Sequence, residues 1–403
     1  MDAQSLRTLR STFAVVERRA EHAVAFFYSH LFWHNPAIRT LFPQDMAPQR
    51  DRLFAALTHL VTHLDDPGLP GYLGQLGRDH RKFLATPALY SAVGASLLAA
   101  FSHCAGAAWT VEAEKAWAEA YGFVADRMTA GADEAAAAGE PPWWDADVLR
   151  HERYGDDLTL LTLRPRRPYP YTAGQYVSVG TPHLPRVWRT YSLANAPRPD
   201  GTLDLHVSRV DGGLMSTVLT ERLRVGETLR LSAPGGALTA RTPPGKPRTY
   251  IAGGTGWAPV RALLEEAAED EPRLEGRLFV VARTKEHLYG RADAERLAGL
   301  IPGLHVTYIT AAPGRPRDQA TDRLVQALRA ALHWPAHDVY LAGPPALLTE
   351  VTEELTALGT DPDRVFHDRL PSAAPHALRP ATRAERLLAP PPLHWHNPAA
   401  REP

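Results

Sequence analysis

The sequence contains very little cysteine. Among its 403 residues only Cys104 carries a thiol. A single thiol cannot form an intramolecular disulfide, and it cannot hold an iron–sulfur cluster that requires four cysteines. Any electron transfer by this chain must therefore use another kind of redox centre. We expect Cys104 itself to be a small buried residue of a helix.

The sequence also lacks an excess of charge of either sign and a long apolar run. Its formal net charge is −1, which gives no indication of a polyanionic partner such as nucleic acid. No apolar run approaches the roughly 20 residues that cross a bilayer. Residues 1–5 lack the basic and apolar regions of a signal peptide. We therefore expect a cytoplasmic protein without nucleic-acid or membrane partners, and a monomer or a weak dimer.

The chain length suits two or three domains, and the first of them reads as helical. Leu6, Leu9, Phe13 and Val16 recur at intervals of three and four residues, which marks one apolar stripe of a helix. Glycine and proline separate this stripe from further helical patterns. Those patterns cover residues 23–32, 49–64, 91–103 and 111–128. Residues 1–139 are therefore predicted to form an all-α domain.

The periodicity changes after a linker at residues 139–144. Leu203, Leu205 and Val207 alternate with polar residues, and residues 228–231 do the same. Turn sequences rich in glycine and aspartate separate these short strands. Residues 140–243 are therefore predicted to form a small antiparallel β-barrel.

Strands then alternate with helical segments. Apolar strands are predicted at residues 249–252, 278–282, 306–309 and 339–342. Such alternation is typical of a parallel sheet with helices on both faces, here over residues 244–371. Residues 372–403 are rich in Pro, Ala and Arg and are predicted to be an irregular tail. His394 and His396 in this tail would make only a weak metal pair.

Two glycine-containing loops follow strands of the predicted α/β domain. The first carries Gly254, Thr255, Gly256 and Pro259 and opens a helix, so its main-chain N–H groups could approach a pyrophosphate. The alternative is a tight turn without a ligand. Gly343 and Pro344 form a second loop at the same carboxyl edge, where open α/β sheets bind ligands.

The predicted barrel has its own candidate residues. Arg189 could pair with a pyrophosphate, and Tyr191 could lie against a flavin. Gly213 and Ser216 stand at a predicted helix start that could bind phosphate. The other reading of residues 189–192 is an ordinary amphipathic strand. The complete set is Arg189, Thr190, Tyr191, Ser192, Gly213 and Ser216.

Taken in order, these motifs resemble the ferredoxin–NADP reductase-like superfamily, from Trp143 to about Leu370. The resemblance adds Tyr176 as a further flavin-contacting residue. It implies FAD between barrel and sheet, with the nicotinamide of NAD(P)H docking on the flavin. Two positions depart from the family: Ala342 replaces a frequent cysteine, and Leu370 replaces the aromatic residue that covers the flavin in flavohaemoglobins.

The helical domain contains several of the chain's 18 histidines, and a lone helical histidine is usually a surface or hydrogen-bonded residue. His80 has a more specific setting, because a proline break and Tyr90 follow it. Gln49 and Leu53 are four residues apart and share one helix face. Tyr28 and Phe42 precede them in the sequence.

These positions resemble the globin domain of bacterial flavohaemoglobins, from about Leu6 to Glu134. The resemblance implies that His80 is the proximal ligand of haem b and that Phe42 packs on the porphyrin. It assigns Tyr28, Gln49 and Leu53 to the distal side, where a phenol and an amide can donate to dioxygen. A tyrosine and a glutamate support the proximal histidine in that family. The counterpart of the tyrosine would be Tyr90. Ungapped alignment gives Ala132 at the position of the glutamate, so its neighbours Asp133 or Glu134 would have to take that role.

Together the two resemblances imply a nitric oxide dioxygenase in which NAD(P)H reduces FAD and FAD reduces haem. One alternative is an oxygen-binding globin that carries its own reductase. Another is an NAD(P)H:flavin oxidoreductase whose globin-like domain holds no haem. Arg283 and Lys285 could bind the 2′-phosphate of NADPH or be solvated charges, so the sequence leaves NADH and NADPH open.

Overall fold

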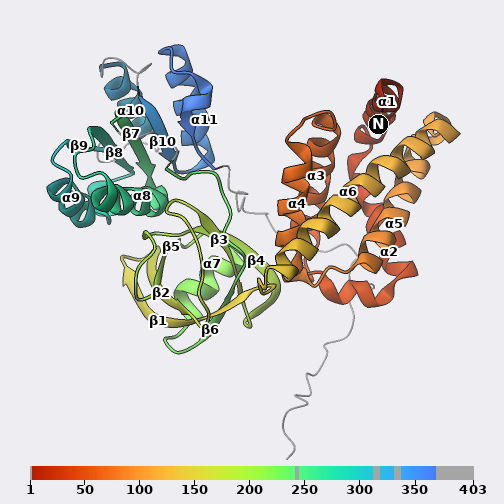
Figure 1. Cartoon of the computed structure of the whole chain (residues 1–403), viewed down its shortest axis with the longest axis horizontal. Helices are drawn as coiled ribbons and strands as arrows, with labels where there is room; N and C mark the ends of the chain where they lie inside the picture. The colour runs from red at the N-terminus through yellow and green to blue at the C-terminus, as the bar shows by residue number, and fades with distance from the viewer. Residues whose placement is uncertain (1, 241–244, 312–317, 331–336, 369–403) are drawn as a thin grey trace, which may run out of the picture.

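Three domains follow one another along the chain (Figure 1). The computed structural model describes residues 2–240, 245–311, 318–330 and 337–368. A helical domain, an antiparallel barrel and a parallel sheet covered by helices occur in the predicted order, which confirms the fold class. The predicted boundary after residue 139 falls in the connection between Ala137 and Trp144. The boundaries after residues 243 and 371 lie outside the described residues.

Within residues 2–139, capping side chains and prolines mark where helices begin. Asp2, Thr86 and Thr110 each accept a hydrogen bond from a main-chain N–H three residues later. Prolines occupy the first turns of α3, α4 and α5, where a missing N–H has no cost. The helices are α1 (Ala3–Glu17), α2 (Ala20–His34), α3 (Ala47–Thr62), α4 (Leu69–His80), α5 (Pro87–Ala105) and α6 (Val111–Ala137).

The expectation that no apolar segment approaches the length of a membrane span is wrong. The segment Pro87–Ala108, which contains α5, is long and apolar enough to cross a membrane by length and composition alone. In the structure its apolar side chains belong to the core of the helical domain. Leu97, Phe101 and Cys104 are buried there, and the Phe101 ring lies 4.6 Å from that of Trp117, centroid to centroid. The prediction that Cys104 is buried is confirmed.

Helix α4 is held by close contact with α6. The sequence pattern did not indicate α4, since its three glycines each lower helix propensity by about 1 kcal/mol relative to alanine. The structure gives a steric reason for Gly77, whereas a Cβ at Gly71 or Gly74 would meet nothing within 4 Å. A Cβ at Gly77 would overlap the main chain of Met128, and a Cβ at Gly131 would overlap that of Gly74. The two helices therefore touch backbone to backbone and run in opposite directions.

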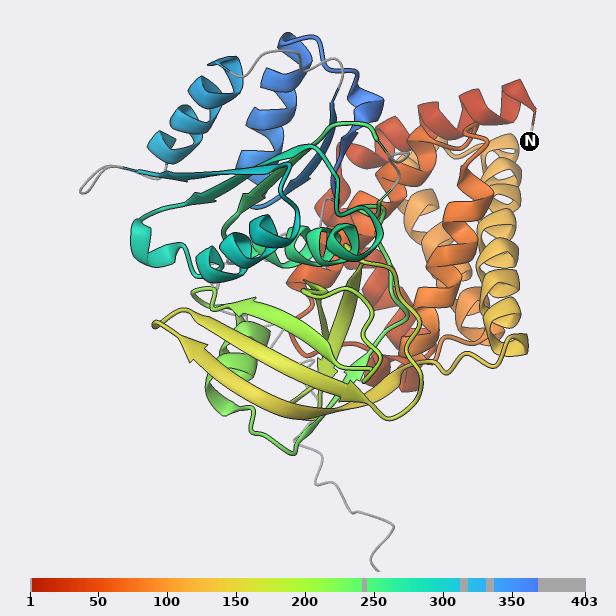
Figure 2. The same cartoon turned by 60° about the vertical axis from the view of Figure 1, so that its left-hand side comes forward.

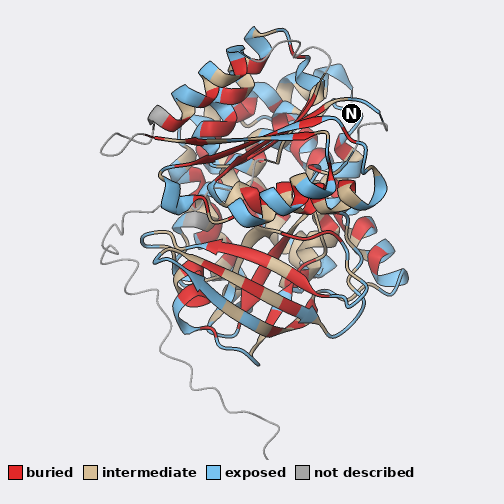
Figure 3. Cartoon of the chain, turned by 90° about the vertical axis from the view of Figure 1, so that its left-hand side faces the viewer, coloured by how far each residue is buried: buried red, intermediate tan, exposed pale blue. Residues whose placement is uncertain are grey.

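The second domain is a barrel of antiparallel strands in the order β4-β3-β6-β1-β2-β5. A bridge between Leu193, just after β4, and Leu205 of β5 brings the two edges of the sheet together. Alternate apolar side chains fill the interior, and much of the ribbon is buried (Figure 3). The strands are β1 (Trp144–Tyr154), β2 (Leu158–Pro165), β3 (Tyr176–Thr181), β4 (Leu184–Ser192), β5 (Leu203–Ser208) and β6 (Thr228–Leu231). A short helix, α7 (Leu214–Thr217), precedes β6.

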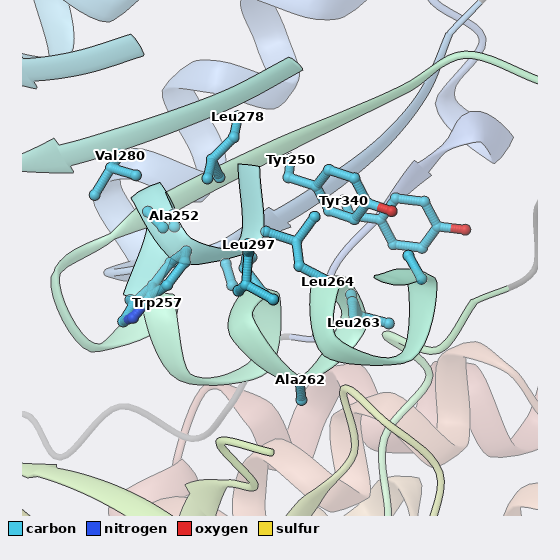
Figure 4. Packing of buried hydrophobic residues seen from close by; sticks show 14 of the residues in the cluster. Tyr250, Ala252, Trp257, Ala262, Leu263, Leu264, Leu278, Val280, Leu297 and Tyr340 are labelled. Carbon is cyan, nitrogen blue, oxygen red and sulfur yellow. The ribbon is translucent and has the colours of Figure 1, made fainter. Parts of the chain in front are cut away.

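The third domain is a parallel sheet in the order β11-β10-β7-β8-β9. Figure 2 shows this sheet between two layers of helices. One face packs on α8 and α9, where Trp257, Leu263 and Leu297 meet the sheet (Figure 4). The other face packs on α10 and α11. The strands are β7 (Arg248–Gly253), β8 (Gly276–Ala282), β9 (Leu304–Thr310), β10 (Asp338–Ala342) and β11 (Val365–Phe366). The helices are α8 (Trp257–Asp270), α9 (Arg291–Leu300), α10 (Asp318–Ala330) and α11 (Pro345–Ala357).

Charged side chains join the barrel to the α/β domain. Asp204 of β5 pairs with Arg198 at 2.9 Å and with Arg261 of α8 at 3.3 Å. His206, also in β5, lies 3.0 Å from the Tyr289 hydroxyl, and burial lowers the pKa of His206 to about 3. A neutral histidine and a paired carboxylate are compatible with burial at this interface.

The contact between α4 and α6 gives a first testable prediction. Gly77→Ala should lower the unfolding free energy of the helical domain by about 1–3 kcal/mol, because the added methyl group must displace the main chain of Met128. Gly74→Ala, one turn earlier, is the matched control, since a Cβ there meets nothing within 4 Å. Thermal melting followed by circular dichroism measures both. Equal melting temperatures for the two variants would contradict the backbone-to-backbone packing.

Candidate active site

A large cavity lies between the helical domain and the barrel. Its volume is about 1920 Å³. That is well above the roughly 300–1000 Å³ of a pocket for one small molecule. Side chains of both domains line it, so residues distant in sequence face the same space. The predicted site residues that line it are Tyr28, Phe42, Gln49, Leu53, His80, Tyr90, Tyr176, Arg189 and Thr190.

His80, the last residue of α4, faces this cavity. Its Nδ1 lies 2.8 Å from the main-chain carbonyl oxygen of Leu76, one turn earlier. A carbonyl can only accept, so Nδ1 carries the proton and Nε2 keeps the lone pair that a metal ion needs. Burial lowers the pKa of His80, which favours this neutral form. The side chain is therefore oriented and protonated as an iron-binding histidine must be.

The predicted distal residues lie on α2 and α3 and in the connection between them. The Tyr28 hydroxyl donates to the main-chain carbonyl of Gln49 at 3.4 Å, and burial raises the pKa of Tyr28. The phenol therefore stays protonated and remains a donor. The Phe42 ring packs edge-on against that of Tyr28 with 5.7 Å between centroids. The Tyr28 phenol thus lies at Gln49, whose main-chain carbonyl accepts its proton and whose side chain acts to lower the Tyr28 pKa. Joint action of this phenol and amide on dioxygen stays a prediction.

The expected carboxylate beside His80 is not found at the predicted position. Asp133 and Glu134 are exposed on α6, and neither lines the cavity. The antiparallel packing of α4 on α6 explains this. Extending that register places Glu134 beside Gly71, nine residues before His80, or about 13 Å along the helix axis. The expectation that Glu134 completes the proximal network therefore does not fit the structure.

Tyr90 lines the cavity from α5, one of the helices that flank His80. Its main-chain carbonyl accepts a hydrogen bond from the Tyr121 hydroxyl at 2.5 Å. Gly94, one turn later, lies directly against the Tyr121 ring, so α5 and α6 are close there. Contact between the Tyr90 hydroxyl and His80 stays a prediction, since the hydrogen bond the structure gives His80 goes to Leu76.

On the barrel side, Tyr176 at the start of β3 forms one corner of the cavity. Its ring lies against the main chain of Gly235 and Gly236, where any Cβ would crowd it. The carboxylate of Asp368 accepts main-chain N–H groups of residues 237–238 at 2.8 and 3.3 Å. Burial, and after it Asp368, raises the pKa of Tyr176. Backbone without side chains beside an aromatic ring gives a surface on which a flat ring system can lie.

The arginine motif lies on the neighbouring strand. The ladder of β3 and β4 pairs Tyr176 with Ser192, so the two predicted flavin motifs are side by side. Arg189 and Thr190 line the cavity. Tyr191 instead packs against the barrel core, and burial raises its pKa. The cation of this motif, rather than its tyrosine, faces the cavity.

The predicted phosphate turn uses its serine internally. The Ser216 hydroxyl donates to the Gly213 carbonyl at 3.0 Å and accepts the Val210 N–H at 3.1 Å. Of this turn, Leu214 lines the cavity. A phosphate role for Gly213 and Ser216 remains a prediction.

The predicted dinucleotide loop lies at the carboxyl edge of the parallel sheet. Gly254–Gly256 connect β7 to α8, and a Cβ at Gly256 would overlap the carbonyl of Ala342 at the end of β10. A Cβ at Gly343 would crowd the main chain of Gly253. Because β7 lies between β10 and β8, the strand order reverses here, and such points hold ligands in open α/β sheets.

The remaining predicted residues of this domain take positions around the same edge. Thr255 lies within the glycine turn, Pro259 in the first turn of α8 and Pro344 just before α11. Arg283 and Lys285 are exposed after β8, which is compatible with either cofactor. Leu370, His394 and His396 lie outside the described residues.

Several cavity residues were not singled out from the sequence. Arg39, Arg52 and Arg186 line the cavity together with Arg189. Burial lowers the pKa of Arg52, and the nearby positive charge of Arg189 lowers it further. Burial and the charge of Arg186 lower the pKa of Arg39 in the same way. Cations of two domains are thus gathered at one space, an arrangement that anionic groups would stabilise. No sequence pattern indicated this cluster, since arginine is common throughout the chain.

Lys82 is a further cavity residue that the sequence analysis did not single out. It is buried beside His80, although the chain contains only four lysines. That rarity in an arginine-rich sequence is the one signal that could have drawn attention to it.

These side chains fit haem and FAD. A neutral histidine with an available Nε2 and an apolar surrounding suits the iron and the faces of a porphyrin. The gathered arginines suit the carboxylates of haem and the phosphates of FAD. Tyr176 with its glycine pair suits the flavin ring.

Three family descriptions match the chain in succession. Globin matches residues 25–128, the oxidoreductase FAD-binding domain residues 145–239, and the oxidoreductase NAD-binding domain residues 250–353. The helical domain is thus a globin domain, which binds haem, and the other two domains bind FAD and NAD.

Curated relatives match over nearly the whole length. Flavohemoproteins of Rhodopirellula baltica and Chromobacterium violaceum are each 28% identical and cover 91% of this chain and 97% and 98% of their own. The flavohemoprotein of Bacillus subtilis is 25% identical, with 91% and 97% covered.

Solved structures show the same fold. A flavohemoglobin from Malassezia yamatoensis superposes with a TM-score of 0.76 at 21% identity, over 91% of this chain and 98% of that one. A cytochrome P450 reductase of Amycolatopsis matches 56% of the chain and 68% of its own, with a TM-score of 0.50 and 27% identity. All three domains thus occur in the order found in flavohemoproteins, to which the chain is similar over nine-tenths of its length.

Proposed function

We propose that this protein is a nitric oxide dioxygenase, which converts nitric oxide and dioxygen to nitrate with electrons from NAD(P)H. Haem would supply the place where the two gases react, and FAD would convert a two-electron donor into single electrons. The observation that carries the proposal is the shared cavity, in which His80 of the globin domain and Tyr176 and Arg189 of the barrel line one space.

The side chains around His80 have separate roles in this proposal. His80 binds iron through Nε2 and is oriented by the Leu76 carbonyl. Tyr28 is a buried, protonated phenol whose single O–H proton turns from the Gln49 main-chain carbonyl, 3.4 Å away, to donate a hydrogen bond to dioxygen. Phe42 and Leu53 keep the pocket apolar and narrow, which favours small uncharged gases. Tyr90 closes the proximal side.

The residues of the other two domains bind and orient the electron donors. Arg189, Thr190 and Tyr176 hold FAD at the cavity, and Tyr191 and Ser192 keep their strand in place. The loops of Gly254 and Gly343 hold the dinucleotide at the sheet edge, where main-chain N–H groups and a helix N-terminus favour phosphate.

Absorption spectroscopy with substrate addition tests the proposed function. Purified full-length protein should show a Soret band with flavin shoulders, become reduced on addition of NADH or NADPH, and then consume nitric oxide in air with formation of nitrate. A Soret band without fast nitric oxide consumption would indicate an oxygen-binding globin instead. Flavin without a Soret band would indicate a flavin reductase with a haem-free globin domain. Comparing the two nucleotides also determines which is preferred.

Replacement of the proposed iron ligand should separate the two halves of the protein. His80→Ala should abolish stable haem binding, because it removes the imidazole whose Nε2 binds iron and whose Nδ1 is held by Leu76, while NAD(P)H-dependent flavin reduction stays within about twofold. His59→Ala, an exposed histidine of α3, is the matched control. Haem content is read from the Soret absorbance per chain. Full haem content in the first variant would show that another residue binds the iron.

Replacement of the distal phenol should affect dioxygen more than haem. Tyr28→Phe should leave haem bound and accelerate dioxygen dissociation about tenfold, since a hydrogen bond of that kind contributes about 1–2 kcal/mol. Stopped-flow displacement of dioxygen by carbon monoxide measures the rate. An unchanged rate would remove Tyr28 from the distal role.

A further inference from the structure

A buried lysine connects the two domains beside the proposed iron ligand. Lys82 follows His80 by two residues, and its side chain is 5% exposed. Its Nζ lies 2.5 and 2.7 Å from the two carboxylate oxygens of Asp79, the residue that precedes His80. The ion pair therefore brackets the end of α4 that carries His80.

The same ammonium reaches into the barrel. Its Nζ lies 3.3 Å from the Ser178 hydroxyl on β3, two residues after Tyr176. It also lies 5.8 Å from the centre of the Trp188 ring on β4, next to Arg189, a distance at which a cation is attracted to an aromatic face. One side chain of the globin domain thus contacts both strands that carry the proposed flavin-binding residues.

Burial of this charge is costly and must be offset by its partners. Removing an ammonium from water disfavours the charged form, and burial lowers the pKa of Lys82 while Asp79 opposes that change. A buried ion pair contributes little net stability compared with an apolar contact of the same shape. What the Lys82 ammonium contributes is a defined position of the end of α4 relative to the barrel. Charge and hydrogen bonds fix such a position, whereas apolar packing leaves it adjustable.

We propose that Lys82 is a positioning residue, which fixes the end of α4 on strands β3 and β4 and thereby sets the rate of electron transfer from flavin to haem. The proposal rests on the proposed function, because it requires both cofactors. Two electrons reach the flavin as a hydride from NAD(P)H, and they leave singly for ferric iron. Lys82 takes up no electron and no proton. It determines the separation and orientation across which each electron moves.

The test measures the two electron-transfer steps separately. Haem- and FAD-loaded full-length wild type, Lys82→Met, Lys82→Arg and Lys115→Met would be mixed anaerobically with NAD(P)H under carbon monoxide. Flavin bleaching reports hydride transfer, and the carbon monoxide Soret band reports arrival of electrons at haem. Lys115 is exposed on α6, so its replacement by methionine is the matched control.

In Lys82→Met, haem reduction should slow at least about tenfold while flavin bleaching stays within about twofold of wild type. Lys82→Arg should restore most of the rate, because it keeps a cation beside Asp79. Lys115→Met should match wild type. A merely structural role would slow both steps together in protein that keeps both cofactors, and that result would overturn the proposal.

Two further outcomes are distinguishable. Unchanged haem reduction in Lys82→Met with both cofactors bound would overturn the positioning role and leave the proposed function intact. A wild type that shows no Soret band would overturn both. If Lys82→Met fails to retain its cofactors, Ser178→Ala replaces it, since this variant removes only the hydrogen bond to the barrel. It should slow haem reduction at least about threefold, and an unchanged rate would overturn the proposal.

Discussion

The packing of α4 against α6 is the contact on which the rest of the arrangement depends. Glycines at the contact bring the two backbones together, and the C-terminal end of α4 is thereby fixed in position. His80 and Lys82 lie at that end, one facing the cavity and the other bonded to the barrel. Helix α6 in turn leads through a short connection into β1. One helix pair therefore fixes both the proposed iron ligand and the entry into the next domain.

Positively charged side chains are concentrated between the helical domain and the barrel. Arginines from the helical domain and the barrel line the same cavity, and the buried Lys82 ammonium, paired with Asp79 of its own domain, reaches across to Ser178 of the barrel. A protein interior tolerates such cations only where anions or hydrogen-bond acceptors compensate them. Haem and FAD both carry anionic groups, so the cofactors we propose would complete the interface as well as perform the chemistry.

Much of the fold could be predicted because its signals are local. Alternation of apolar and polar residues defined the barrel strands, and strand–glycine–helix sequences located the edge of the parallel sheet. The resemblance to flavohaemoglobins then supplied His80, Tyr28 and Tyr176, which the structure brings to one cavity. Each of these features depends on residues that are close together in the chain.

The incorrect expectations concern contacts between distant segments. Helix α4 was not indicated, because its glycines oppose a helix unless α6 is there to pack against them. No apolar run near 20 residues was expected, although Pro87–Ala108 has that length and the composition of a core helix surrounded by others. Alignment gave Ala132 at the proximal position and its neighbour Glu134 was expected to take the role, whereas the register of α6 on α4 places Glu134 on an exposed surface.

The sequence by itself determined the domain order through its periodicities, and its resemblance to flavohaemoglobins implied the cofactors and the iron-binding role of His80. Only the tertiary structure decided what supports that histidine and what joins the domains. The Leu76 carbonyl, the barrel contact of Lys82 and the gathering of arginines depend on helix register and domain docking. Those are set by the packing of residues far apart in the chain, and no local pattern encodes them.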